Sequence, residues 1–211
     1  IEYDASSEEI VREFNDPDIG TDLFLKTLKR SRYRSRGQMI AVRSVLSMPS
    51  GANIVVALPT GEGKSLIFQL VQSAGFFGEL KSKKDDLVVV VVPTVALGIN
   101  HEKEAQKILG LEHSLTYQGG KEERNQSILT KIEENNQKIC FAAPEAVCGV
   151  LSRQLKNLAT KGKLKAVIID EAHLVEQWGT DFRTEFQELG TLVKQFNDLA
   201  NHLSTSATVE T

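Results

Sequence analysis

The 211-residue sequence has only two cysteines, one tryptophan and no apolar run close to the roughly twenty residues that a membrane-spanning helix needs. Cys140 and Cys148 have neither the spacing of metal ligands nor that of a disulfide framework. No secretory signal opens the chain. These absences argue against a membrane protein and a secreted disulfide-rich domain. We expect a reduced compartment, such as the cytoplasm or the nucleus.

The sequence also lacks a strong excess of either charge. It has 25 Lys and Arg against 28 Asp and Glu, a formal net charge of −3. Any contact with nucleic acid must therefore use a local basic patch. One short segment is rich in basic residues: Lys26, Lys29, Arg30, Arg32, Arg34 and Arg36. Because charge runs more often form solvated faces, we expect a solvated face for residues 26–32.

What the sequence does contain is an alternation of β-branched runs with helical patterns. The five consecutive valines of residues 88–92 suit a strand that is covered on both faces. The pattern predicts strands over residues 53–58, 87–92, 114–117, 138–142, 164–170 and 202–205. It predicts helices over residues 38–48, 65–75, 95–109, 121–135, 151–160 and 184–200. This order predicts an α/β fold: a doubly wound, mainly parallel sheet flanked by helices on both faces.

Two adjacent carboxylates, Asp170 and Glu171, follow the apolar run of residues 166–169. They should stand at the C-terminal end of a buried strand, where open parallel sheets bind their ligands. One carboxylate can hold Mg²⁺, usually through water, and its neighbour can orient or deprotonate an attacking water. The pair therefore predicts a hydrolytic centre.

Aromatic and cationic residues follow the carboxylates directly, namely Trp178, Phe182 and Arg183. Such side chains stack on unpaired bases and contact phosphates. Aromatic residues near a sheet usually belong to the core, but the polar residues around Trp178 have no apolar periodicity that would bury it. We expect an exposed loop beside the metal site, so that a nucleic-acid sensor and the hydrolytic centre share one short segment.

A phosphate-binding segment lies more than a hundred residues upstream, between a predicted strand and a predicted helix. Gly61 and Gly63 let several backbone N–H groups point at one anion. Lys64 can reach the β- and γ-phosphates of a nucleotide, and the Ser65 hydroxyl can ligate the metal. Leu58 stands where the strict motif has glycine. A glycine-rich turn is the simpler alternative, but it explains neither the Lys-Ser pair nor the distant carboxylates.

These motifs resemble those of the first RecA-like domain of superfamily 2 DEAH-box helicases, and specifically those of the RecQ family of DNA helicases. The resemblance covers residues 33–208. Residues 58–65 resemble motif I and residues 170–173 resemble motif II. Residues 177–183 resemble the aromatic-rich loop that in this family couples single-stranded DNA binding to ATP hydrolysis, and residues 206–208 resemble motif III.

Shorter motifs extend the resemblance. Pro93-Thr94 corresponds to motif Ia, and Ala143-Pro144-Glu145 resembles a DNA-backbone motif that often reads Ser-Pro-Glu. Gly119-Gly120 is either a glycine doublet that approaches the nucleic-acid backbone or a simple turn. The histidines at 101, 113 and 202 have no partners at ligand spacing, so no zinc site is predicted.

Gln38 resembles the glutamine that reads adenine in these motors, because a carboxamide can accept from N6 and donate to N7. The family usually has an aromatic residue four positions earlier and an arginine three positions earlier. Here Arg34 and Ser35 occupy those positions, with Tyr33 and Arg36 displaced by one. Which side chain stacks on adenine stays open.

The resemblance implies a role for each motif residue. The catalytic group is Lys64, Asp170, Glu171 and His173, of which His173 is expected to connect to motif III. Nucleotide contacts are expected from Gln38, Arg36, Pro59, Thr60, Gly61, Glu62, Gly63, Lys64 and Ser65. Metal contacts are expected from Ser65 and Asp170. DNA binding and coupling are expected from Trp178, Phe182, Arg183, Thr94, Pro144, Glu145, Ser206 and Thr208.

The function that the resemblance implies is that of an ATP hydrolase that uses ATP and Mg²⁺, the motor of a DNA helicase. Residues 1–32 are expected to form a helical lead-in and residues 33–211 the ATP-binding domain. The implied partners are DNA, single-stranded or junction-containing, and a second RecA-like domain of the same polypeptide, but no membrane. That second domain supplies an arginine finger worth about 10³–10⁵ in rate, so this chain alone should hydrolyse ATP poorly.

Two other functions fit the same residues. One is a superfamily 2 translocase or remodeller that moves on DNA without separating its strands. The other is a nucleotide-gated nucleic-acid binding module that has lost catalysis, against which the intact Lys64, Ser65, Asp170 and Glu171 argue.

Overall fold

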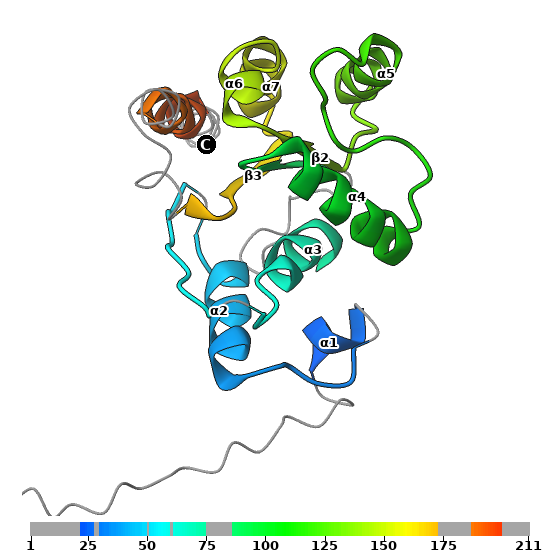
Figure 1. Cartoon of the computed structure of the whole chain (residues 1–211). Coiled ribbons are helices and arrows are strands. Elements are labelled where there is room, and N and C mark those ends of the chain that lie inside the picture. Colours follow the sequence, from blue (N-terminus) through cyan, green and yellow to red (C-terminus); the bar gives the residue numbers. More distant parts are fainter. Residues whose placement is uncertain are drawn as a thin grey trace, which may run out of the picture.

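A computed structural model describes residues 22–27, 30–49, 51–59, 61–74, 86–172 and 187–199 of the chain (Figure 1). Within these residues, β1 (Leu87–Val91), β2 (Ile139–Ala142) and β3 (Leu164–Ile169) form one sheet. The strand order is β2-β1-β3, and both pairings of the central strand are parallel. The sequence prediction of an α/β fold with a parallel sheet is confirmed.

Helices surround the sheet. They are α1 (Leu23–Thr27), α2 (Arg36–Leu46), α3 (Ser65–Ala74), α4 (Val95–Leu109), α5 (Glu122–Glu133), α6 (Pro144–Cys148), α7 (Ser152–Thr160) and a further helix over residues 187–199. Figure 1 shows α2, α3 and α4 on one side of the sheet, and α6, α7 and the last helix on the other. No helix in the described ranges is both long and apolar enough to cross a bilayer.

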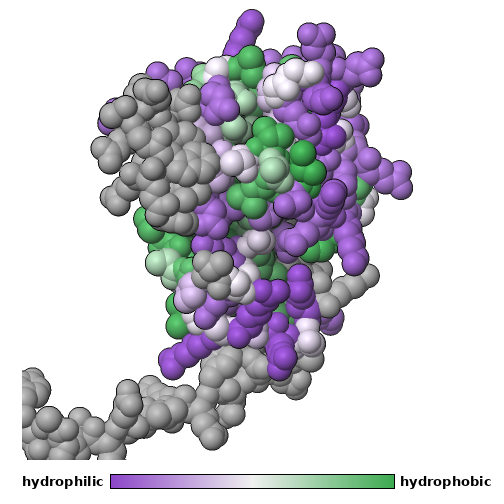
Figure 2. All heavy atoms as spheres, in the orientation of Figure 1, coloured by the Kyte–Doolittle hydropathy of each residue, from purple (hydrophilic) through white to green (hydrophobic). Residues whose placement is uncertain are grey.

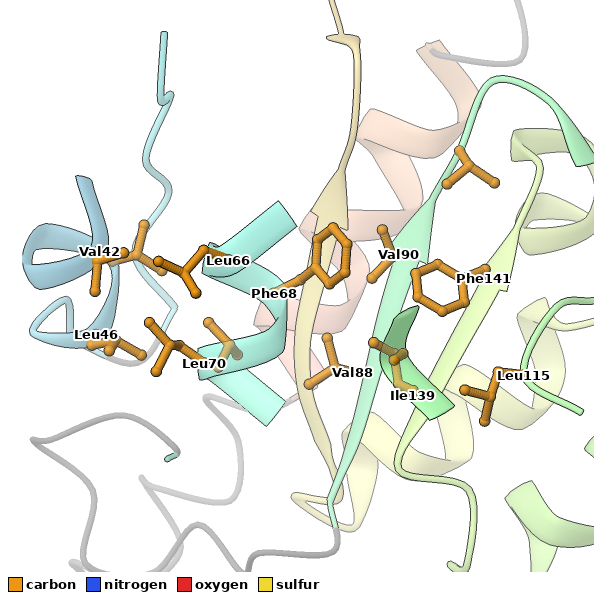
Figure 3. Close-up of a cluster of buried hydrophobic side chains, with 14 of the residues drawn as sticks. Val42, Leu46, Leu66, Phe68, Leu70, Val88, Val90, Leu115, Ile139 and Phe141 are labelled. Carbon is orange, nitrogen blue, oxygen red and sulfur yellow. The ribbon is translucent and has the colours of Figure 1, made fainter. Parts of the chain in front are cut away.

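The valine run explains why both faces of the sheet are covered. Val88 and Val90 point into a core formed with α2, α3 and Phe141 of β2, whereas Val89 and Val91 point into a second core formed with α5, α7 and the last helix. All five residues of β1 are buried. Figure 3 shows Phe68 of α3 beside Val90 in the first core. Each buried valine contributes on the order of 1.5–3 kcal/mol, which anchors the central strand.

The surface is polar over most of the face drawn in Figure 2, with smaller areas of apolar side chains between hydrophilic ones.

The N-terminal part of the described chain is joined to the first core. Leu25 of α1 is 1% exposed in that core, and Asp22 accepts hydrogen bonds from the Tyr33 hydroxyl and from Arg43 of α2. Burial, together with the charge of Asp22, raises the pKa of Tyr33.

Two strand predictions are wrong. Residues 53–58 have no regular secondary structure, and Val55 is 94% exposed. The β-branched composition of residues 53–58 favours a strand, but a strand also needs a neighbouring strand to supply hydrogen bonds. Residues 114–117 form only an isolated parallel bridge, Thr116 with Phe141, in which the Phe141 N–H donates to the Leu115 carbonyl and the Tyr117 N–H donates to the Phe141 carbonyl, both at 2.8 Å.

The helix predictions are close to the structure. The predicted helix over residues 95–109 is confirmed as α4, and Thr94 caps it by accepting from the Leu97 N–H. The prediction for residues 38–48 begins two residues late, since the cap is Ser35 and α2 starts at Arg36. Helix α6 was not predicted. The predicted strand over residues 202–205 lies outside the described residues.

Helix α4 approaches the sheet closely at Gly98. A Cβ atom at this position would lie 2.8 Å from Thr116 Cγ2 and 3.3 Å from Val92 Cγ2. Both neighbours are buried, so neither has room to move away. The glycine therefore sets the distance between α4 and the strands.

We predict that Gly98→Ala destabilises the domain by about 1–3 kcal/mol, the usual cost of overpacking a core. Gly190→Ala is the matched control: Gly190 lies in the last helix, and no atom of the described residues lies within 4 Å of the place that a Cβ would take. There alanine should stabilise the domain by about 0.5–1 kcal/mol. Urea unfolding measures both changes, and equal effects of the two substitutions would contradict the close approach of α4.

Candidate functional site

The glycine-rich segment before α3 has the shape of a phosphate-binding loop. Gly61 and Gly63 have positive φ angles of 86° and 75°, a conformation that favours glycine over residues with a side chain. A Cβ on Gly63 would lie 2.5 Å from Gln38 Nε2, so the close approach also requires glycine. Lys64 follows, and α3 begins at Ser65. The N-terminus of that helix favours a bound anion.

The start of α2 holds this segment in place. Gln38 is 3% exposed; its Nε2 donates to the Gly63 carbonyl at 2.9 Å, and its Oε1 accepts from the Arg34 N–H at 2.7 Å. The Arg34 guanidinium donates to the Gly61 carbonyl, and the Ser35 hydroxyl donates to Glu62. A primary carboxamide has two N–H donors and two acceptor lone pairs, so Gln38 keeps capacity for a further ligand.

The structure bears on which residue stacks on adenine. Tyr33 is 2% exposed and its hydroxyl donates to Asp22, so the ring is part of the core. Arg34 is exposed and contacts the glycine-rich segment. Of the two, Arg34 is the side chain that a base can reach.

The carboxylates stand at the C-terminal edge of the sheet. The Asp170 N–H donates to the Val91 carbonyl at 2.9 Å, which continues the pairing of β3 with β1 by one residue. Glu171 then turns the chain with a φ of 52°, and its N–H donates to Asp170 Oδ1 at 3.0 Å. Glu171 Oε2 accepts from Lys64 Nζ at 3.4 Å. Both side chains of this ion pair are 29% exposed.

These elements enclose one cavity of about 270 Å³. Its lining includes the predicted residues Gln38, Gly61, Gly63, Lys64, Ser65, Asp170 and Glu171. Lys64 and Asp170, more than a hundred residues apart in the sequence, therefore face the same space. Its dimensions and mixed polarity suit a small ligand that carries negative charge.

Arginines on the segment before α2 also line the cavity, namely Arg30, Arg32 and Arg34. The expectation of a merely solvated face for residues 26–32 was therefore incomplete. Arg36, the predicted nucleotide contact, is exposed at the start of α2 and is not among the described lining residues.

His101 is a site residue that sequence reasoning missed. It comes from α4, and its Nε2 lies 3.0 Å from Asp170 Oδ2. The two residues are 69 positions apart, and no motif connects them. Only the packing of α4 against the sheet brings them together.

The donors present fit a magnesium ion. The Ser65 hydroxyl and the Asp170 carboxylate are hard oxygen donors that line one cavity. Within the described ranges, no cluster of three or more His, Cys, Asp or Glu side chains has the geometry of a metal site. Mg²⁺ usually takes one or two protein ligands and completes its shell with water and substrate phosphates, so two oxygen donors are sufficient for it.

Other predicted residues lie elsewhere or outside the described ranges. Thr94 is exposed at the N-cap of α4; Pro144 is buried as the first residue of α6, and Glu145 beside it is exposed. Pro59 and Glu62 belong to the glycine-rich segment, next to the described lining but not part of it. The residues that fall outside the described ranges are Thr60, His173, Trp178, Phe182, Arg183, Ser206 and Thr208.

Comparison with known proteins identifies the family. A family model described as DEAD/DEAH box helicase matches residues 35–211, most of the chain. The chain belongs to the DEAD/DEAH box helicase family. The RecA-like fold expected from the sequence is confirmed.

Individual relatives carry RecQ-type names. The chain is 29% identical over 163 residues to the ATP-dependent DNA helicase RecQ of Haemophilus influenzae. The match covers 77% of this chain and 24% of that protein. It is 33% identical over 158 residues to the ATP-dependent DNA helicase Q-like 4B of Arabidopsis thaliana, covering 71% of this chain and 12% of that protein. This helicase domain therefore spans a quarter or less of the length of these relatives.

We predict that Gln38→Ala weakens ATP binding about tenfold, or 1.4 kcal/mol, because the adenine contact is lost. Affinity for GTP should change little, since guanine offers the opposite donor and acceptor pattern at its six position. Competition of ATP and GTP against a fluorescent nucleotide measures both affinities. An equal loss for both nucleotides would show that Gln38 only supports the glycine-rich segment.

Proposed function

We propose that this chain is the ATP-binding motor domain of a RecQ-like, ATP-dependent DNA helicase. In this proposal the domain couples ATP hydrolysis to binding of single-stranded DNA and to strand separation. The observation that carries it is the shared cavity of Lys64, Ser65, Asp170 and Glu171, built at the C-terminal edge of a parallel sheet.

Charge and geometry support a triphosphate as the ligand. Lys64, Arg30, Arg32 and Arg34 place positive charge around the cavity, and the N-terminus of α3 adds its dipole. Gln38 stands at the same cavity with a carboxamide suited to adenine. The base and the phosphates of ATP thus each have a complementary group.

Lys64 Nζ and Glu171 Oε2 form an ion pair at 3.4 Å, and both residues line the cavity. When phosphate oxygens approach, they compete with Glu171 for the Lys64 ammonium. A partly exposed ion pair is worth only about 0–1 kcal/mol, so the exchange costs little. Glu171 is then released at the position where it can orient a water toward the γ-phosphate.

Ser65 and Asp170 are the residues that would hold a magnesium ion, which supplies charge neutralisation for the phosphates when bound. The sheet fixes the backbone of Asp170, because the Asp170 N–H donates to the Val91 carbonyl. The Asp170 Oδ1 atom accepts from the Glu171 N–H, which fixes the side chain. The carboxylate is therefore placed before any ligand arrives, which lowers the cost of assembling the site.

DNA as the partner rests on the names of the relatives and on the aromatic segment after Glu171. The Haemophilus influenzae and Arabidopsis thaliana relatives are both named as DNA helicases. Trp178, Phe182 and Arg183 follow Glu171 by seven to twelve positions, so a base stacked there acts on the segment that leads from the carboxylates. The proposal further states that the motor separates the strands of DNA and does not only move along it.

We predict that Glu171→Gln in the full-length protein lowers DNA-stimulated ATP hydrolysis by about 10²–10⁴-fold, the usual contribution of a general base. Binding of ATP should persist, because Lys64 loses only its competing partner. Lys64→Ala is the contrasting variant, and it should lose nucleotide affinity itself. Phosphate release and nucleotide binding are measured on both. Wild-type hydrolysis by Glu171→Gln would contradict the proposed role of this carboxylate.

We predict that Trp178→Ala keeps nucleotide binding but uncouples ATP hydrolysis from DNA. Stacking one base on tryptophan is worth about 1–3 kcal/mol, enough to shift a two-position loop. The measurement is the ATPase rate of the full-length protein with and without single-stranded DNA. Unchanged stimulation in the variant would remove the loop from the coupling mechanism.

An unwinding assay and a translocation assay on the full-length protein separate the helicase from a translocase. A helicase separates a labelled duplex in an ATP-dependent reaction, whereas a translocase displaces bound protein and leaves the duplex intact. A binding module would show neither activity and would hydrolyse no ATP, so these assays distinguish all three functions.

A further inference from the structure

We infer that His101 is a positioning residue that holds the Asp170 carboxylate in the orientation required for magnesium-bound nucleotide. This inference rests on the proposed function, since it concerns the same cavity. It adds a residue from α4 that belongs to neither the glycine-rich segment nor the Asp170–Glu171 motif. His101 Nε2 lies 3.0 Å from Asp170 Oδ2, and both side chains are largely buried, at 11% and 14% exposure.

Two phenylalanines fix the plane of the His101 ring. Phe68 of α3 packs edge-on at a centroid distance of 5.1 Å, and the ring of Phe141 of β2 stacks on it at 5.8 Å. Phe68 is 3% exposed and Phe141 is fully buried, so both are held by the first core. A ring clamped in this way has little freedom to turn its Nε2 away from Asp170.

The hydrogen bond has a defined direction. An ionised carboxylate can only accept, so His101 Nε2 carries the hydrogen and donates to Asp170 Oδ2. The other oxygen, Oδ1, accepts from the Glu171 N–H at 3.0 Å. Both carboxylate oxygens thus have one protein donor, which fixes the side-chain rotamer and leaves their remaining lone pairs for a ligand in the cavity. Such supporting hydrogen bonds are typical of carboxylates that bind metal ions.

The position of His101 is itself fixed by the next residue on α4. Glu102 is 6% exposed and accepts from the Thr116 N–H and from the Arg124 guanidinium, while Arg124 Nε donates to the Thr116 carbonyl at 3.0 Å. Two adjacent residues of α4 therefore have different partners. His101 contacts the Asp170 carboxylate, and Glu102 contacts Thr116 in the segment that leads to Gly119-Gly120. A rotation of α4 that removed His101 from Asp170 would have to break this partly buried ion pair and the hydrogen bond from the Thr116 N–H.

The test measures magnesium dependence rather than hydrolysis. In the full-length protein, binding of the fluorescent analogue N-methylanthraniloyl-ATP is followed while Mg²⁺ is titrated, and also in EDTA without Mg²⁺. We expect His101→Leu, which keeps apolar volume but has no donor, to raise the Mg²⁺ concentration for half-maximal binding by about tenfold. Binding in EDTA should equal that of the wild type.

Two amide variants provide the matched control. The Nε2 of glutamine reaches about as far as the Nε2 of histidine, whereas the shorter asparagine amide reaches only the Nδ1 position. His101→Gln should therefore restore the wild-type magnesium dependence within about twofold, and His101→Asn should resemble His101→Leu. Should His101→Leu fail to fold in urea or thermal unfolding, the comparison of the two amides still decides the question.

The Asp170→Asn background shows whether His101 acts through Asp170. There, His101→Leu should cause no additional change in magnesium dependence, because the group that it positions is already altered. An equal tenfold loss in both backgrounds would overturn the inference, as would wild-type magnesium dependence in His101→Leu. If the wild type itself shows no Mg²⁺-dependent nucleotide binding, the proposed function fails, and the inference fails with it.

Discussion

The parallel pairing of β3 with β1 is the constraint on which the site depends. It runs in register from Val88 with Ala166 to Val91 with Ile169, and the Asp170 N–H extends it by one bond. Because β1 is buried on both faces, its position is set by two cores at once. Because β3 pairs with β1, the two carboxylates that follow β3 are held in a fixed position as well. A carboxylate on a loop would not be held so firmly against the lysine of a distant segment.

The site is assembled from three directions, each with its own support. Helix α2 holds the glycine-rich segment through Gln38, the sheet places Asp170, and α4 brings His101 to the carboxylate. Lys64 meets Glu171 across the cavity that these elements leave. Each support lies in a buried or partly buried contact, which places the side chains of the cavity in advance. An incoming triphosphate competes with Glu171 for the Lys64 ammonium.

Sequence reasoning predicted most of the described helices and the central strand because their signals are local. The valine run follows from side-chain sterics, and the glycines at 61 and 63 follow from the positive φ angles of their turn. It failed for residues 53–58, where composition favours a strand but no strand of the described residues pairs with the segment. It also missed His101, since its role depends on the packing of α4 and on two phenylalanines from other elements. Contacts of this kind leave no trace in local patterns.

The most direct test of the account is a double-mutant cycle on the affinity for magnesium-bound ATP. The dissociation constant is measured by calorimetry for wild type, Lys64→Ala, Asp170→Asn and the double variant. If both residues act on one bound triphosphate and its ion, the losses will not add, with a coupling free energy above about 0.5 kcal/mol. Strictly additive losses would mean that Lys64 and Asp170 serve separate sites, which would contradict the account.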